Sequence, residues 1–280
     1  ALSGQHSISI LCRVLEVNRS TYYKHLRRQP SRRQQENMEI RKRILALYAS
    51  SDKRLDVRKM TLCLAREHCI TVSEGRVYRL MKQMRLPKMS TVKPPRAAAS
   101  KEDACLCQNL LSQRFNQKAP NLVWVCDFTY VKVAGKFHYI CAILNLYARK
   151  VIACRVGSKI DRFLAIDTLR DAVRLRGVSK GVMFHTDQGS QFTSRDFRML
   201  IDDLGMIQPF SAKGHPYDNA VMECFFKYLK KEKLDRRNFQ SLDQLKQSLL
   251  SYISGFYNSR RPHSHNHGLP PILAENSFLS

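Results

Sequence analysis

The chain is short of acidic residues, of tryptophan and of long apolar runs. Its 280 residues include 23 Asp and Glu against 48 Lys and Arg, with a single Trp, a formal net charge of +25 and a pI near 10.0. So large an excess of positive charge predicts a polyanionic partner, and nucleic acid is the most common one. The longest mainly apolar run, residues 137–148, is shorter than the roughly 20 residues of a membrane-spanning helix, so no membrane partner is expected.

Paired cysteine motifs are also lacking. None of the nine cysteines forms a CxxC pair, and Cys105-Leu-Cys107 has no second pair to complete a metal site. Cysteine-based zinc sites are built from such pairs, and disulfide frameworks from an even number of cysteines. We therefore expect reduced and mostly buried thiols in a cytosolic protein.

The positive charge is concentrated in the first part of the chain. Residues 1–120 hold 25 Lys and Arg against 9 Asp and Glu, whereas residues 121–280 hold 23 against 14. Because basic side chains make most phosphate contacts, the first part is predicted to hold DNA.

Residues 1–34 are predicted to be a helix-turn-helix DNA-binding segment. Apolar residues recur at helical spacing between residues 8 and 15, Val17-Asn18 fits a turn, and Ser20 or Thr21 can cap a second helix. An ordinary helical hairpin is the alternative, and the local density of basic residues favours DNA binding. The predicted DNA contacts in this segment are Arg19, Tyr22, Tyr23, Lys24, Arg27 and Arg28.

Four further segments follow along the chain. Residues 35–87 are predicted to be a second helical DNA-binding domain of three short basic helices, the last capped by Ser73. Residues 88–120 contain a Pro pair and an Ala-rich run, which are typical of a linker. Residues 121–236 carry the β-rich core, and residues 237–280 a C-terminal helix and a basic tail.

The core alternates strands and helices in a recognisable order. Three β-rich runs, the first two joined at Gly135, precede a helix at 162–175 and a short buried strand that ends at Asp187. A helix, a short strand at 206–210 and a further helix complete the order βββαβαβα. This is the order of ribonuclease-H-like domains, whose first strand lies in the centre of the sheet with the fourth beside it. We predict an α/β, ribonuclease-H-like core of the retroviral integrase type, preceded by all-α helix-turn-helix units.

Three acids in this core are the candidate catalytic residues. Asp127 lies within the first strand, Asp187 at the end of the fourth, and Glu223 on a later helix, with 35 residues between it and Asp187. Taken singly, each could be a loop, cap or solvated residue. Their apolar neighbours and the order of elements favour convergence, because a buried carboxylate without a partner is costly. Three carboxylates at one point can hold two divalent cations, as two-metal phosphoryl transfer requires.

Polar residues around these acids are the candidate DNA contacts. Asn219, Lys227 and Lys230 share a helical face with Glu223, and the two lysines are predicted to bind phosphates. Lys231 and Lys233 are expected on a solvated face. Further candidates are Gln191 after Asp187, Lys213 in the loop before the Glu223 helix, and Arg260 and Arg261 near the C-terminus.

The C-terminal stretch NSRRPHSHNHG has two interpretations, a metal site and a basic loop. His263, His265 and His267 alternate along it, but this spacing on a loop matches zinc sites poorly. A basic loop that faces DNA is the preferred interpretation.

Several motifs together resemble one family. The stretches DFTY, HTDQGSQFTS, KGHPYDNAVMECFFKYLKKE and YNSRRPH are similar to those of bacterial transposases of the insertion-sequence-three family, in the downstream-frame, catalytic part. The resemblance implies that Asp127, Asp187 and Glu223 are a DDE triad that uses two Mg²⁺ ions, with Mn²⁺ as a substitute. It also implies single-strand cleavage at the ends of a mobile element, followed by strand transfer from the freed 3′-OH.

The resemblance sets the expected partners and leaves two alternatives. The partners would be terminal inverted repeats and target DNA, bound by a homodimer or higher oligomer in the cytoplasm of a bacterium, at the nucleoid. A retroviral-type integrase would carry an HHCC zinc module, for which residues 1–60 offer only His6, His25 and Cys12. A non-catalytic, sequence-specific DNA-binding regulator with an integrase-like fold is the alternative from another class, and the intact triad disfavours it.

Overall fold

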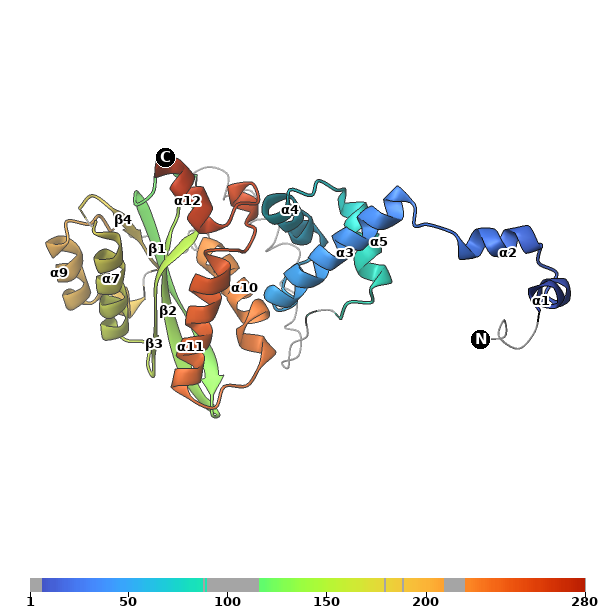
Figure 1. Cartoon of the computed structure of the whole chain (residues 1–280). Helices are drawn as coiled ribbons and strands as arrows, with labels where there is room; N and C mark the ends of the chain where they lie inside the picture. The colour runs from blue at the N-terminus through green and yellow to red at the C-terminus, as the bar shows by residue number, and fades with distance from the viewer. Residues whose placement is uncertain are drawn as a thin grey trace, which may run out of the picture.

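The computed structural model describes residues 7–87, 89, 116–178, 180–187, 189–208 and 220–279. An all-helical N-terminal part is followed by an α/β part (Figure 1). The predicted linker at 88–120 lies almost entirely outside the described residues, as do the predicted contacts Lys213 and Asn219.

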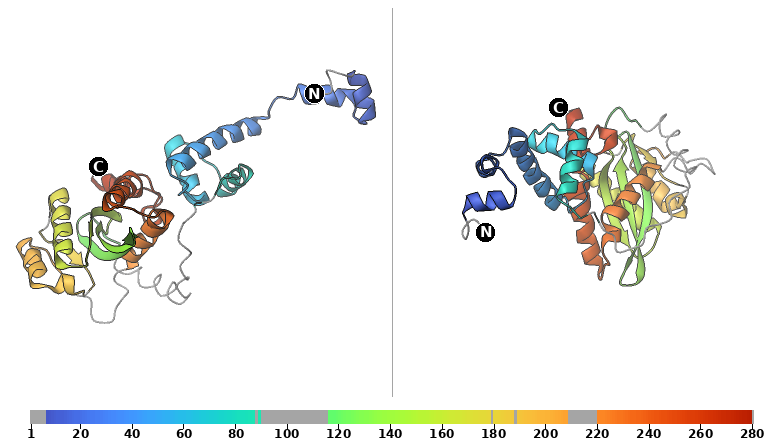
Figure 2. Two further views of the ribbon diagram at one scale, coloured as in Figure 1. Left: turned by 90° about the horizontal axis from the view of Figure 1, so that it is seen from below. Right: turned by 90° about the vertical axis from the view of Figure 1, so that its right-hand side faces the viewer.

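Two short helices begin the described chain, as the sequence predicts. They are α1 (Ile8–Val14) and α2 (Arg19–Leu26), and they lie apart from the other helices in Figure 1 and in the left view of Figure 2. The cap of α2 is Asn18 rather than Ser20 or Thr21, because its side chain accepts from the Ser20 backbone N–H at 2.9 Å.

The three helices predicted after residue 35 are confirmed. They are α3 (Arg32–Ser50), α4 (Val57–His68) and α5 (Glu74–Gln83), called here the three-helix unit. Side-chain caps start all three, at Ser31, Asp56 and, as predicted, Ser73. Their apolar stripes meet in a common core, whose fully buried members include Ile44, Met60, Leu64 and Val77.

The central sheet has the strand order β3-β2-β1-β4, which confirms that the first strand is internal and neighbours the fourth. The strands are β1 (Val123–Val133), β2 (Lys136–Asn145), β3 (Lys150–Gly157) and β4 (Met183–His185). β1 pairs antiparallel with β2 and parallel with β4. The strand expected at 206–210 is reduced, in its described part, to one parallel bridge between Ile207 and Met183.

Helices cover both faces of the sheet (Figures 1 and 2). Side chains alternate between the faces of a strand, so Trp124 and Cys126 of β1 contribute to one core and Val125 to another. The first core includes helices α7 (Arg162–Arg176), α8 (Ser190–Thr193) and α9 (Arg195–Asp203). The second includes α10 (Ala220–Glu232) and α11 (Leu242–Tyr252). The remaining turns are η3 (Leu234–Arg236), the π-helical η4 (Ile253–Tyr257) and η5 (Ser264–Asn266).

The cysteines that the structure describes carry free thiols, and Cys12, Cys63, Cys126 and Cys141 are buried. The Sγ atoms of Cys126 and Cys141 lie 3.6 Å apart in neighbouring strands. Both thiols contribute to the core beneath α7.

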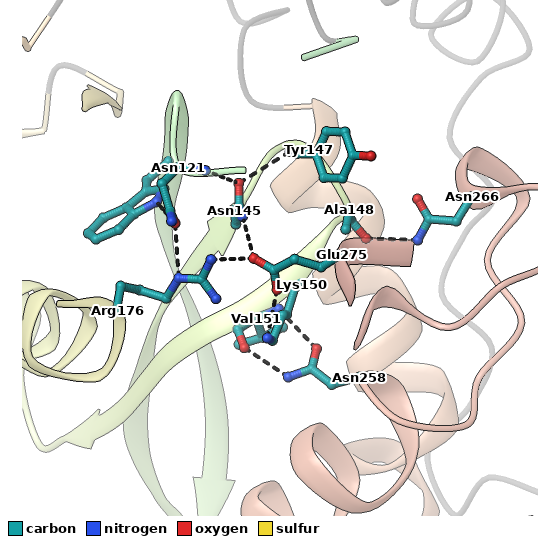
Figure 3. A network of polar contacts seen from close by, with 11 residues as sticks. Asn121, Asn145, Tyr147, Ala148, Lys150, Val151, Arg176, Asn258, Asn266 and Glu275 are labelled. Carbon is teal, nitrogen blue, oxygen red and sulfur yellow. Dashed lines mark hydrogen bonds and ion pairs between the residues drawn. The ribbon is translucent and has the colours of Figure 1, made fainter. Parts of the chain in front are cut away.

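The C-terminal segment is attached to the end of the sheet by polar contacts (Figure 3). Helix α12 (Pro271–Leu279) carries Glu275, a residue that is 1% exposed. It accepts from Asn145 Nδ2 at 3.1 Å, lies 2.6 Å from Lys150 Nζ and also pairs with Arg176. These cations keep the pKa of Glu275 below its usual range despite its burial.

Two asparagines add to this attachment. Asn258 exchanges two hydrogen bonds with the backbone of Val151, and Asn266 donates to the Ala148 carbonyl at 2.8 Å (Figure 3). Two of the three histidines of this stretch, His263 and His265, are half-buried, whereas His267 is exposed. Burial and the nearby Arg261 lower the pKa of His263 to about 3, and His265 Nε2 lies 3.0 Å from the Tyr147 carbonyl. A DNA-facing loop therefore stays a prediction for the exposed residues of this segment.

Candidate catalytic site

Asp127 lies within β1, and Asp187 lies two residues beyond the end of β4. In the parallel pairing of β1 with β4, Val125 stands opposite His185, and each acid follows its member of this pair by two residues. Both acids therefore lie near the C-terminal end of β4. Burial, the Cys141 thiol and the charges of Asp127 and Asp187 raise the pKa of Cys126.

Helix α10 brings Glu223 to the same face of the sheet. The core that contains Val125 also contains Met222 and Phe225, which flank the exposed Glu223 in the first turns of α10. Within the described ranges, which omit 209–219, no three acidic, His or Cys residues form a group that could hold a metal ion. The convergence of the three acids on one metal site stays a prediction.

Asp187 contacts the backbone of Gly189. Asp187 Oδ1 accepts from the Gly189 backbone N–H at 3.1 Å. A Cβ on Gly189 would lie 2.1 Å from Gln191 Nε2, so the Gln191 side chain packs against the Gly189 backbone and would have to move to admit a larger residue.

The donor set fits a hard divalent cation. It consists of carboxylate oxygens, the ligands that Mg²⁺ prefers. Although the chain has a net charge of +25, no Lys or Arg in the described part forms an ion pair with Asp187 or Glu223. Both acids are exposed, so their oxygens are accessible to a cation from solution.

The lysines of α10 differ in their surroundings. Lys227 and Lys231 are exposed, whereas Lys230 is half-buried and its Nζ lies 4.7 Å from the centre of the Tyr130 ring on β1. The prediction that Lys233 lies on a solvated face is wrong. It is 7% exposed, and its burial, with Arg54 nearby, lowers its pKa to about 8.

The predicted contacts of α2 lie on its surface. Arg19, Lys24, Arg27 and Arg28 are all exposed. Tyr22 is half-buried and meets Tyr23 edge to face, with ring centres 5.5 Å apart. The α1–α2 pair also exposes apolar side chains, including those of Val14 and Leu15.

The adjacent arginines 260 and 261 have different environments. Arg260 is half-buried, with Nη2 3.1 Å from Ser50 Oγ. Arg261 is 3% exposed, pairs with Glu232 through three hydrogen bonds of 2.9–3.1 Å, and lies 4.0 Å from the Tyr228 ring centre. Arg261 is thus a buried structural residue, which corrects its prediction as a surface contact with DNA.

Two buried acids, Glu232 and Glu275, have no clear signal in the sequence. Glu232 lies in the run KKEK, which resembles a solvated charged face. Glu275 lies in a short segment near the C-terminus. Their partners are distant along the chain, so a local pattern cannot reveal their burial.

Models of known families match most of the chain. The "HTH-like domain" matches residues 35–94, and two models described as "Integrase core domain" match residues 117–216 and 204–271. The solved HTLV-2 integrase catalytic core domain in complex with magnesium, dimeric form, aligns with 58% of this chain and 99% of its own, at 19% identity and a TM-score of 0.41. By its matched models the chain is an integrase-core protein with an HTH-like unit.

Proteins of similar sequence define the family more closely. The "Insertion element IS600 uncharacterized 31 kDa protein" of Shigella sonnei is 32% identical over 96% of this chain and 98% of its own length. The "Transposase InsF for insertion sequence IS3A" of Escherichia coli strain K12 is 30% identical over 99% and 96%. The chain belongs to the insertion-sequence-three family of transposases. No helix in the described ranges is both long and apolar enough to cross a membrane.

Proposed function

We propose that this chain is a DNA transposase that cleaves one strand at each end of an insertion sequence and joins the freed 3′-OH to a new phosphodiester. In the first step a water oxygen attacks phosphorus and the bond to the 3′ oxygen breaks. In the second step that 3′ oxygen attacks the phosphorus of another phosphodiester and forms a bond to it, the bond from this phosphorus to its former 3′ oxygen breaks, and a new 3′-OH is released. The parallel pairing of β1 with β4, which ends two residues before Asp127 and Asp187, together with the packing of α10 in the core that contains Val125, supports this proposal.

Asp127, Asp187 and Glu223 would hold the divalent cations, two Mg²⁺ per site with Mn²⁺ as a substitute. Bound there, the ions supply charge stabilisation for the attacking and leaving oxygens. The chain itself contributes the fixed placement of two acids by the sheet and of the third by α10. Gln191, beside Asp187, offers an amide to the DNA backbone.

The decisive experiment incubates the whole chain with duplex DNA that carries the inverted repeats of its own element. We expect Mg²⁺- or Mn²⁺-dependent appearance of a nicked strand with a 3′-OH, and joining of a pre-cut end to a second duplex. Specific binding of the repeats without cleavage under either metal would instead support the non-catalytic regulator.

Lys227 and Lys230 are proposed to bind phosphates of the DNA end that enters the site. Replacing both with Ala is expected to slow the joining of a pre-cut end about tenfold or more at saturating DNA, because small misplacement of the scissile bond is costly. Dissociation constants should change less, since many other cations hold the DNA. The measurement is single-turnover joining beside a binding titration.

The control replaces Lys231, in the last turn of α10, and Arg237, which follows the helix; both are exposed. Lys233 is unsuitable as a control because it is buried. Equal slowing by both double variants would show that α10 acts as a general charged surface.

Arg27 and Arg28 of the α1–α2 pair are proposed to contact phosphates, with Arg19, Tyr22 and Lys24 on the same helix or beside it. The double variant Arg27→Ala/Arg28→Ala should reduce the steepness of binding against salt by about 2 in a plot of log K against log salt. A fluorescence titration at several salt concentrations measures this slope. Arg170→Ala/Arg174→Ala on exposed positions of α7 should leave it unchanged, and a matching loss there would contradict the assignment.

A further inference from the structure

A buried carboxylate at the C-terminal end of α10 collects partners from three parts of the chain. Glu232 is 3% exposed and would be costly to bury without compensation. Arg261 donates to both of its oxygens, and Tyr252 Oη donates at 3.0 Å. Lys59 of α4 lies 3.7 Å from its Oε1. Arg54 is a further partner of Glu232.

Arg54 contacts the backbone carbonyl of Glu232. Its Nε donates to the Glu232 carbonyl at 3.1 Å, and its guanidinium lies 4.8 Å from the Phe256 ring centre. Cations are favoured at a helix C-terminus, where carbonyls lack intrahelical partners. The three-helix unit therefore supplies two cations, Arg54 and Lys59, to the last turn of α10.

Other polar contacts extend this joint between the three-helix unit and the catalytic core. Asp52 pairs with Arg236 of η3 at 2.7 Å. Arg66 donates to the Arg260 carbonyl at 3.1 Å, and Arg260 in turn reaches Ser50. Figures 1 and 2 show the three-helix unit beside α10. The joint thus involves charged side chains on both sides, concentrated around the end of α10.

The same helix carries the proposed catalytic acid. Glu223 and Glu232 occupy opposite ends of α10, about 13 Å apart at the usual rise of a helix. Between them Phe225 and Leu229 are buried against the sheet. A helix packed in this way moves as one body, so a fixed C-terminal end fixes the direction in which its first turn points.

We propose that Lys59 and Glu232 are positioning residues that join the three-helix unit to α10 and so set the place of Glu223. This inference rests on the proposed function for the role of Glu223. Its consequence is that DNA held by the three-helix unit is held at a fixed place relative to the acid on α10. A loosened joint would lower the rate of joining while leaving the affinity for DNA nearly unchanged.

Lys59 is the residue to test, because Glu232→Gln would leave Arg261 buried without a counter-charge and could prevent folding. Lys59→Met keeps the length of the side chain and removes its charge, and Lys59→Arg restores the charge. Arg58→Met is the matched control, since Arg58 is the preceding residue of α4 and is exposed.

The first readout is hydrogen exchange of the whole chain without DNA or metal. Lys59→Met should speed exchange in the last two turns of α10 about fivefold, whereas Arg58→Met and Lys59→Arg should resemble the wild type. The second readout is the joining of a pre-cut end at saturating DNA. Lys59→Met should be about tenfold slower with a dissociation constant within about twofold of wild type, and Lys59→Arg should recover most of the rate.

Each result decides a separate point. Equal hydrogen exchange in Lys59→Met and Arg58→Met would contradict the proposal that Lys59 joins the three-helix unit to α10. Faster exchange in Lys59→Met with an unchanged joining rate would contradict the proposal that this joint positions Glu223. If the wild type joins no DNA with either metal, the proposed function fails, and the exchange comparison still decides the joint.

Discussion

Asp127→Asn, Asp187→Asn and Glu223→Gln are each expected to abolish strand cleavage and strand transfer. The fall in rate should be at least about a thousandfold, which corresponds to about 4 kcal/mol of transition-state stabilisation. Each change replaces a charged oxygen ligand with an amide of nearly equal size, so the fold should persist. The measurement is single-turnover cleavage and joining with Mg²⁺ and, separately, with Mn²⁺.

DNA binding separates a catalytic loss from a folding loss. Affinity for the element ends should stay within about threefold of wild type, because the proposed contacts are made by basic residues elsewhere. Asp196→Asn is a suitable control, since Asp196 is an exposed acid in the first turn of α9, where it pairs with Arg162. Activity near the wild-type level in any one of the three variants would remove that acid from the triad.

The sequence predicts the pairing of β1 with β4 because the information is local. Apolar runs define both strands, and their parallel register brings Val125 opposite His185, two residues before Asp127 and Asp187. The position of Glu223 depends on more distant parts of the chain. The sequence identifies its helix, but residues 209–219, which precede α10, are not described, and the described acids do not form a metal-binding group.

The sequence fails where a charge depends on distant partners. Lys233 and Glu232 are adjacent in a run that resembles a solvated surface, yet both are buried. The joint between the three-helix unit and α10 explains this, because Arg54 and Lys59 reach α10 from far along the chain. Hydrophobic periodicity predicts separate helices but carries no information on which charged faces meet.

Arg261 and Arg260 test whether a buried charged pair contributes more to stability than a partly exposed one. Arg261→Met should lower the free energy of unfolding by about 3–5 kcal/mol, because it leaves Glu232 buried without its bidentate partner. The thermal midpoint should fall on the order of 10 °C. Arg260→Met removes a half-exposed side chain whose ion pair with Glu67 is 3.6 Å long, and it should cost less than about 1 kcal/mol.

Calorimetry and denaturant titration of both variants give these values without any assay of DNA. The double variant Arg261→Met/Glu232→Gln should recover part of the loss, since the buried charge that Arg261 balanced is then also absent. If Arg260→Met were as destabilising as Arg261→Met, or if the second change restored nothing, burial of the Arg261–Glu232 pair would not be the cause. The buried Arg261–Glu232 pair connects the end of α10 to the C-terminal segment. The stability of the core and the position of Glu223 therefore both depend on the Glu232 carboxylate.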